Sequence, residues 1–145
     1  MNNNKRNRNA FTLVEILIVV VILGILASVV VANMLSSVED AQVATAKNEL
    51  GKLQRAVEIY VARNQNEMPT VTAGDGTWGE IVNTREYLKE APANPYVGTS
   101  NARVIAIGTA PDAAYQTTHG WIYDSTTGEV WAGGFDANGD PLPKP

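Results

Sequence analysis

The feature that most constrains this chain is an uncharged apolar stretch near its start. No charged residue occurs between Glu15 and Glu39, and most residues of that interval are Val, Ile or Leu. As a helix, the stretch from Ile16 to Leu35 would span about 30 Å, the thickness of the hydrocarbon core of a bilayer. The rest of the 145-residue chain is polar, Gly-rich and acidic. We therefore expect one apolar helix joined to one water-soluble domain, which excludes a membrane protein with several spans and a disordered chain.

Charge is divided unevenly along the chain. Lys5, Arg6 and Arg8 give the first ten residues a charge of +3, and the rest carries −7, for a net charge of −4. A basic segment ahead of an apolar helix favours a cytoplasmic N-terminus. The acidic remainder argues against binding of nucleic acid through bulk charge. Cysteine is absent, which excludes disulfides, thiolate metal sites and cysteine nucleophiles.

The apolar stretch has two ordinary interpretations, a plain single-span anchor and a secretory signal peptide. A signal peptide would be cut after Ala32, so that the mature chain would begin at Asn33. Glu15 argues against both interpretations, because a carboxylate carried to mid-membrane costs roughly 2.5–3.5 kcal/mol. Neither an anchor nor a signal peptide has a use for this carboxylate.

The residues around Glu15 form a motif. Residues 10–15 read Ala-Phe-Thr-Leu-Val-Glu, behind a short basic leader and ahead of the apolar stretch. This segment resembles the signature of type IV prepilins, the family that comprises type IV pilins and the pseudopilins of type II secretion systems. That signature is a small residue, usually Gly, followed by Phe-Thr-Leu, an aliphatic residue and Glu. Ala10 stands where Gly is usual.

The resemblance implies how the chain is processed and where it resides. It implies cleavage between Ala10 and Phe11 by a membrane prepilin peptidase, then N-methylation of Phe11. Residues 1–10 are then a leader peptide, residues 11–36 the transmembrane and filament-core half of a helix, and residues 37–145 a soluble periplasmic domain. It further implies a single-pass inner-membrane protein that assembles into a helical homopolymer. Its partners would be the lipid bilayer, minor pseudopilins and an inner-membrane assembly platform.

The place of Glu15 on the helix suggests a role in subunit docking. Cleavage would give Phe11 a free ammonium, and a carboxylate four residues later lies one turn away on the same helix face. In lipid this carboxylate needs a positive partner, either its own N-terminus or that of a neighbouring subunit. In the second case the carboxylate stays unpaired unless the next subunit docks at the correct axial offset.

After Val38 the apolar residues recur at the spacing of an amphipathic helix, so we expect one nearly continuous helix from Phe11 to Asn64. Its apolar face comprises Val43, Ala46, Leu50, Leu53, Val57 and Tyr60. The further expected elements are a loop over 65–79, a short helix over 78–89, a non-helical turn over 91–98, a strand over 104–108 and a hairpin of 120–124 with 129–133. The tail over 136–145 is expected to lack regular structure.

This order of elements resembles the α+β pilin fold, in which a long N-terminal helix packs on a small antiparallel β-sheet. Two further segments, 53–70 and 87–96, resemble loops of the major pseudopilins. The second of them has Asn94 where an Asp is usual. These matches favour the pseudopilin branch of the family.

The candidates for site chemistry are few. His119 is the only histidine, which excludes a histidine metal cluster, and we expect it on the surface or in a turn. Asp136, Asn138 and Asp140 resemble the start of a calcium loop but lack its later bidentate Glu. We expect a plain Asx-Gly turn there, with no metal and no cofactor, and the resemblance to major pseudopilins implies a C-terminal calcium site as the alternative.

The aromatic residues of the hairpin and the absence of catalytic motifs bear on function. We expect Trp121, Tyr123 and Trp131 to form cross-strand core rather than a ligand platform. No hydrolase, phosphate-loop or zinc-protease motif occurs. We therefore predict a non-enzymatic structural subunit of a type IV pilus-like filament, most like a type II secretion pseudopilus. The alternative is a minor type IV pilin that acts as an adhesive or DNA-uptake module, which the acidic charge does not favour.

Overall fold

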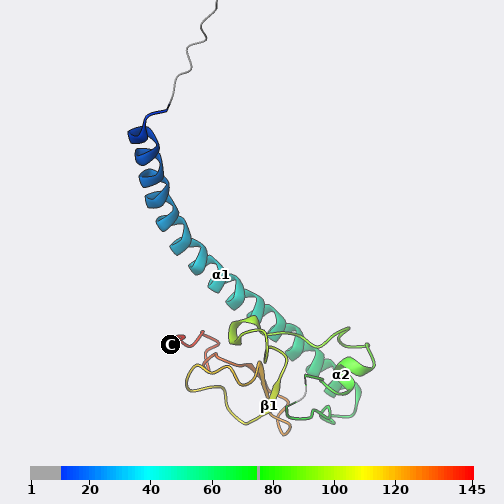
Figure 1. Cartoon of the computed structure of the whole chain (residues 1–145). Helices are drawn as coiled ribbons and strands as arrows, with labels where there is room; N and C mark the ends of the chain where they lie inside the picture. Colours follow the sequence, from blue (N-terminus) through cyan, green and yellow to red (C-terminus); the bar gives the residue numbers. More distant parts are fainter. Residues whose placement is uncertain (1–10, 75) are drawn as a thin grey trace, which may run out of the picture. The chain divides into compact units, whose positions relative to one another are not determined.

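The computed structural model describes residues 11–74 and 76–145 (Figure 1). The chain divides into two compact units, Met1–Val38 and Glu39–Pro145. Helix α1, Leu13–Arg63, contributes to both units and confirms the predicted long helix to within two residues at each end. The predicted leader, with Ala10 at its cleavage site, lies outside the described residues.

The first unit is the apolar half of α1. From Phe11 to Val31 every side chain is exposed, with 81% exposure for Phe11 and 51% for Ile22. By length and composition α1 qualifies as a helix that could cross a membrane. The Ser28 hydroxyl, within the apolar stretch, donates to the carbonyl of Ile25 at 2.7 Å, so this polar group is satisfied by its own helix.

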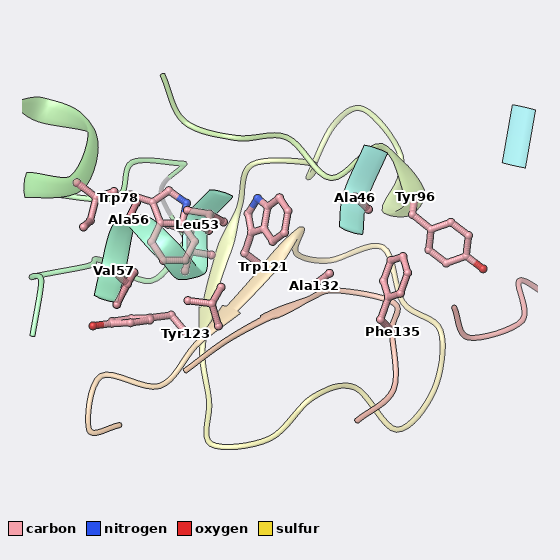
Figure 2. Packing of buried hydrophobic residues seen from close by; sticks show 13 residues of the cluster. Ala46, Leu53, Ala56, Val57, Trp78, Tyr96, Trp121, Tyr123, Ala132 and Phe135 are labelled. Atoms are coloured by element: carbon pink, nitrogen blue, oxygen red, sulfur yellow. The ribbon is translucent and has the colours of Figure 1, made fainter. Parts of the chain in front are cut away.

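The second half of α1 packs its apolar face on the rest of the second unit. Ala46, Leu53 and Val57 are buried, and Val43, Leu50 and Tyr60 are partly buried against them, as the periodicity predicts. Figure 2 shows side chains of this face beside aromatic residues of the sheet and loops. The buried partners of the helix include Trp78, Ile81, Tyr96, Trp121, Tyr123 and Phe135.

The predicted hairpin is present. Strand β2, Trp121–Tyr123, pairs antiparallel with β3, Val130–Ala132. Gly128 in the turn has a φ of +80°, a conformation that glycine adopts without steric cost. Trp121 and Tyr123 are buried as expected, but Trp131 is only partly buried, since it pairs with Ile122 on the other face of the sheet.

The sheet is mixed, so the expectation of a purely antiparallel sheet is wrong. Strand β1, Ile105–Ile107, pairs parallel with β2, and the order is β1-β2-β3. Parallel neighbours require a crossover connection rather than a tight turn. Residues 108–120 provide that connection, and His119 within it is partly buried.

Two short helices differ from expectation. Helix α2 covers only Glu80–Asn83 instead of 78–89, and Arg85, two residues after its end, has a φ of +56°. The expected non-helical turn contains a single 3-10 turn, η1, over Pro95–Val97. Its N-cap is Asn94, whose side-chain oxygen accepts from the Tyr96 amide.

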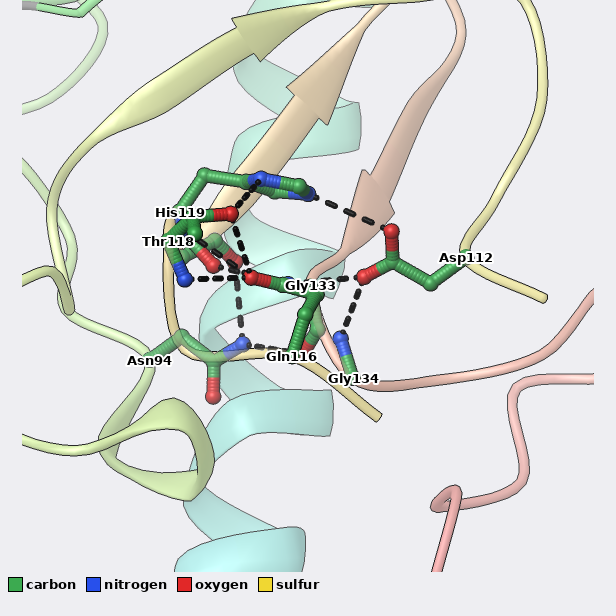
Figure 3. A network of polar contacts seen from close by, with 8 residues as sticks. Asn94, Asp112, Gln116, Thr118, His119, Gly133 and Gly134 are labelled. Atoms are coloured by element: carbon green, nitrogen blue, oxygen red, sulfur yellow. Dashed lines mark hydrogen bonds and ion pairs between the residues drawn. The ribbon is translucent and has the colours of Figure 1, made fainter. Parts of the chain in front are cut away.

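Asn94 is a fully buried polar residue that joins the turn to both strands at the open end of the hairpin. Its side-chain nitrogen donates to the carbonyls of Gly120 and Gly133, each at 2.9 Å (Figure 3). Its side-chain oxygen accepts from Tyr96 N at 3.0 Å. An ionised aspartate at this position could not donate to these two carbonyls.

We therefore predict that Asn94→Asp destabilises the second unit more than Asn94→Ala. The alanine variant loses hydrogen bonds and should cost about 1–3 kcal/mol. The aspartate variant adds a buried charge beside two carbonyl oxygens and should cost at least about 3–5 kcal/mol. Denaturant unfolding measures both variants, with Asn83→Asp, at an exposed residue of α2, as the control. An Asp variant as stable as the Ala variant would contradict this account of Asn94.

The second unit should also fold without the apolar half of α1, because all its core residues follow Glu39. A fragment from Ser37 onward should be monomeric by size-exclusion chromatography and melt cooperatively by circular dichroism. Aggregation, or the absence of a transition, would mean that the face from Val43 to Tyr60 does not form an intramolecular core.

Candidate functional site

The head of α1 is a capping box formed by Thr12 and Glu15. The Thr12 amide donates to Glu15 Oε2 at 2.8 Å, and the Thr12 hydroxyl donates to the same oxygen at 3.0 Å. The Glu15 amide donates back to Thr12 Oγ1 at 3.2 Å. This reciprocal arrangement satisfies amides that a helix start leaves unpaired. The carboxylate is therefore held at the start of its own helix, beside exposed Phe11.

Sequence reasoning missed this role of Thr12. The signal was available, because a Thr three residues before a Glu at the start of an apolar stretch is the capping-box pattern. The hydrogen bonds lower the cost of placing Glu15 in an apolar environment, but they do not neutralise its charge. Within the described residues no basic side chain makes an ion pair with Glu15.

A polar network in the second unit surrounds His119, which lies in the connection before β2 and is partly buried rather than fully on the surface. The side chains of His119 and Asp112 are only 16% and 14% exposed, and His119 Nε2 lies 3.4 Å from Asp112 Oδ1. Asp112 Oδ2 accepts from Gly134 N at 2.7 Å and from the side-chain Nε2 of Gln116 at 2.8 Å (Figure 3). The network joins the crossover connection to the end of β3.

The three candidate calcium ligands lie in a tight turn. Asp136 Oδ1 accepts from Asn138 N at 2.8 Å and from Asp140 N at 2.9 Å, and Gly139 has a φ of +76°. The Asp140 amide, more than the other contacts, lowers the pKa of Asp136. Among the described residues no group of three or more acidic or histidine side chains is placed to hold a metal. The side chain of Asp136 thus serves the backbone of an Asx-Gly turn, and calcium binding by Asp136, Asn138 and Asp140 stays a prediction.

A groove of about 380 Å³ lies between α1 and β3. Leu50, Trp131 and Phe135 supply its apolar lining, and residues 136–139 form part of its wall. At the edge of β3, Gln54 donates to the carbonyl of Val130 at 3.1 Å. Because Trp131 lines this groove and is only partly buried, it does not belong to the cross-strand core.

The long helix with an apolar head, packed on a small sheet, defines the class of pilin-like proteins. The model of the prokaryotic N-terminal methylation motif matches residues 5–31. No solved structure matches the chain.

The similar proteins specify the family further. Relatives named type II secretion system core protein G are 33% identical over 104 residues in Pseudomonas aeruginosa and 38% over 99 residues in Vibrio cholerae. Each alignment covers 63% of this chain, and 70% and 67% of those proteins. A relative of the same name from Aeromonas hydrophila is 41% identical over 70 residues, 48% of each chain. The chain belongs to the type II secretion system core protein G family, the major pseudopilins. The predicted non-enzymatic, structural class is thereby confirmed.

The Asx-Gly turn predicts how the tail responds to chelation. Because backbone amides occupy the Asp136 carboxylate, a chelator should leave the melting temperature of the protein unchanged. Asp136→Ala should lower that temperature equally with and without chelator, since it removes the turn bonds. Thermal melts of both proteins in calcium and in chelator test this. A chelator-induced drop that Asp136→Ala abolishes would restore the calcium site, because an ion bound only to the folded state stabilises it.

Proposed function

We propose that this chain is a filament-forming subunit of a type II secretion pseudopilus. The prepilin peptidase cleaves it between Ala10 and Phe11, and Phe11 is then N-methylated. The apolar half of α1 anchors it in the inner membrane with a cytoplasmic N-terminus, and residues 37–145 lie in the periplasm. The methylation motif over residues 5–31 and the relatives named core protein G support this proposal.

The observation that carries the proposed docking role is the capping box at the head of an exposed apolar helix. Thr12 supplies the Glu15 carboxylate with hydrogen-bond donors but with no positive charge. A carboxylate that enters lipid without a cation keeps most of its desolvation cost. The ammonium of Phe11 on a neighbouring subunit offers the missing charge, so correct docking is favoured over incorrect offsets.

The proposed partners follow from this assembly. The first is a second copy of the chain, because a helical homopolymer repeats one contact between identical subunits. The prepilin peptidase acts on the leader before assembly, and the lipid bilayer holds the unassembled subunit. Minor pseudopilins and an inner-membrane assembly platform are proposed on the strength of the family alone.

The test replaces Glu15 in the full chain with Leu or with Gln. Leu removes both the charge and the capping acceptor, whereas Gln keeps an acceptor for the Thr12 amide but removes the charge. We expect both variants to insert and to be cleaved, because the cleavage site lies upstream of the substitution. Filament yield should fall to less than about a tenth in both, since the neighbour's ammonium is left unpaired in lipid.

Three measurements keep these steps separate. Intact mass of membrane-extracted protein reports processing, with a mature chain beginning at Phe11 and bearing one methyl group. Membrane content reports insertion, and electron microscopy reports filaments. Wild-type filaments from Glu15→Gln would show that capping suffices and would remove the charge-pairing role. A mature chain beginning at Asn33 would instead identify the apolar stretch as a signal peptide. Glu58→Gln, on the polar face of α1, is the matched control.

A further inference from the structure

The segment after β3 folds back on itself. Phe135 and Pro141 form an antiparallel bridge, and the Leu142 amide donates to the Gly134 carbonyl at 2.9 Å. The Asp136 amide donates to the Asp140 carbonyl at 2.9 Å and closes the turn between them. We call residues 136–144 the strap.

The ammonium of Lys144 lies in a site built from α1 and the 3-10 turn. Its Nζ is 4.1 Å from the centroid of the Tyr96 ring, within the range of a cation–π contact. It donates to Gln42 Oε1 at 3.1 Å and lies 4.0 Å from Glu39 Oε1. Glu39 and Gln42 are three residues apart, so they share one face of the helix. An aromatic face, an amide oxygen and a carboxylate together suit an ammonium ion.

The receptor for this ammonium belongs to the core. Tyr96 is buried and packs edge-on against Tyr115 at 5.7 Å and tilted against Phe135 at 5.0 Å. Burial, followed by the nearby Glu39 carboxylate, raises the pKa of Tyr96. The ring is therefore held in place whether or not a cation covers it, and the carboxylate beside it favours a positive group.

The strap itself has far fewer fixed contacts. Most of its side chains are exposed or partly exposed. Tyr96 Oη donates to the Leu142 carbonyl at 2.6 Å, and Lys47 lies 3.9 Å from Asp140 across exposed side chains. Exposed ion pairs of this kind contribute little. Besides the Leu142–Gly134 hydrogen bond and the Phe135–Pro141 bridge at its base, the strap is attached to the rest of the unit through Tyr96 and the face of α1 that carries Glu39 and Gln42.

We infer that residues 136–144 are a strap that opens and closes on α1 without unfolding of the core, and that Lys144 is its clasp. Closed, the strap places the Lys144 ammonium against Glu39 and Gln42 and forms part of the wall of the groove beside Trp131. Open, it leaves an ammonium site free. The state of the strap therefore decides whether this face of the helix is occupied by the chain's own lysine.

The test compares Lys144→Gln with wild type by hydrogen–deuterium exchange of the full chain in detergent micelles. Loss of an exposed cation–π contact should speed exchange about two- to fivefold in a peptide over 136–145 and in one over 39–47. The Leu142 amide, which donates to Gly134 outside the strap, reports its detachment, whereas the Asp140 amide, bonded to Asp136 within the strap, reports only the turn. Exchange in β2 and the melting temperature should stay unchanged.

Two variants serve as controls. Lys144→Arg keeps the charge and can stack on Tyr96, so it should restore wild-type exchange. Lys89→Gln removes an exposed lysine elsewhere and should have no effect on the strap. Unchanged exchange in Lys144→Gln would overturn the clasp. Faster exchange in β2 as well would show that the strap unfolds together with the core, which would overturn its independent opening.

Discussion

One helix has to satisfy two different environments, and the rest of the structure depends on this. The first half of α1 presents apolar side chains on all sides, so that in water nothing within its unit covers them. The second half has a single apolar stripe and polar residues opposite, so it can cover a sheet and still face water. The change falls near Val38, where the chain also divides into two units. A continuous helix thereby connects an apolar segment to a folded domain without a loop.

The sheet depends on this helix. Its strands have three residues each, too few to be stable alone, and they gain their stability from packing against α1 and the loops. Polar side chains hold the loops in place where regular pairing ends. Asn94 joins the turn before η1 to both strands at the open end of the hairpin, and Asp112 joins the crossover connection to Gly134. Much of this domain is therefore organised by buried or half-buried polar groups with several partners each.

The sequence predicted those parts of the structure that periodicity and local chemistry control. The length of α1 and its buried face follow from apolar residues that recur every three or four positions. The hairpin with Gly128 follows from alternation at every second position. The parallel pairing of β1 could not be predicted, because it depends on the path of a long connection. The partial burial of His119 could not be predicted for the same reason. At the head of the helix, Glu15 was identified from its cost in lipid, whereas Thr12 required only recognition of the capping-box pattern.

Several acidic residues of this chain are stabilised in the same way, by hydrogen bonds from backbone amides rather than by basic side chains. Glu15, Asp124 and Asp136 each accept hydrogen bonds from backbone amides at the start of a helix or turn. For Asp124 the amide of Thr126 is the largest cause that lowers its pKa, and for Asp136 it is the amide of Asp140. A lowered pKa in the folded state means that the carboxylates of Asp124 and Asp136 stabilise the fold at neutral pH. That contribution is lost as the pH falls through the lowered pKa, because protonation weakens the acceptor. Hydrogen bonds from backbone amides to ionised carboxylates thus stabilise these turns of the second unit, and ion pairs play a small part in them.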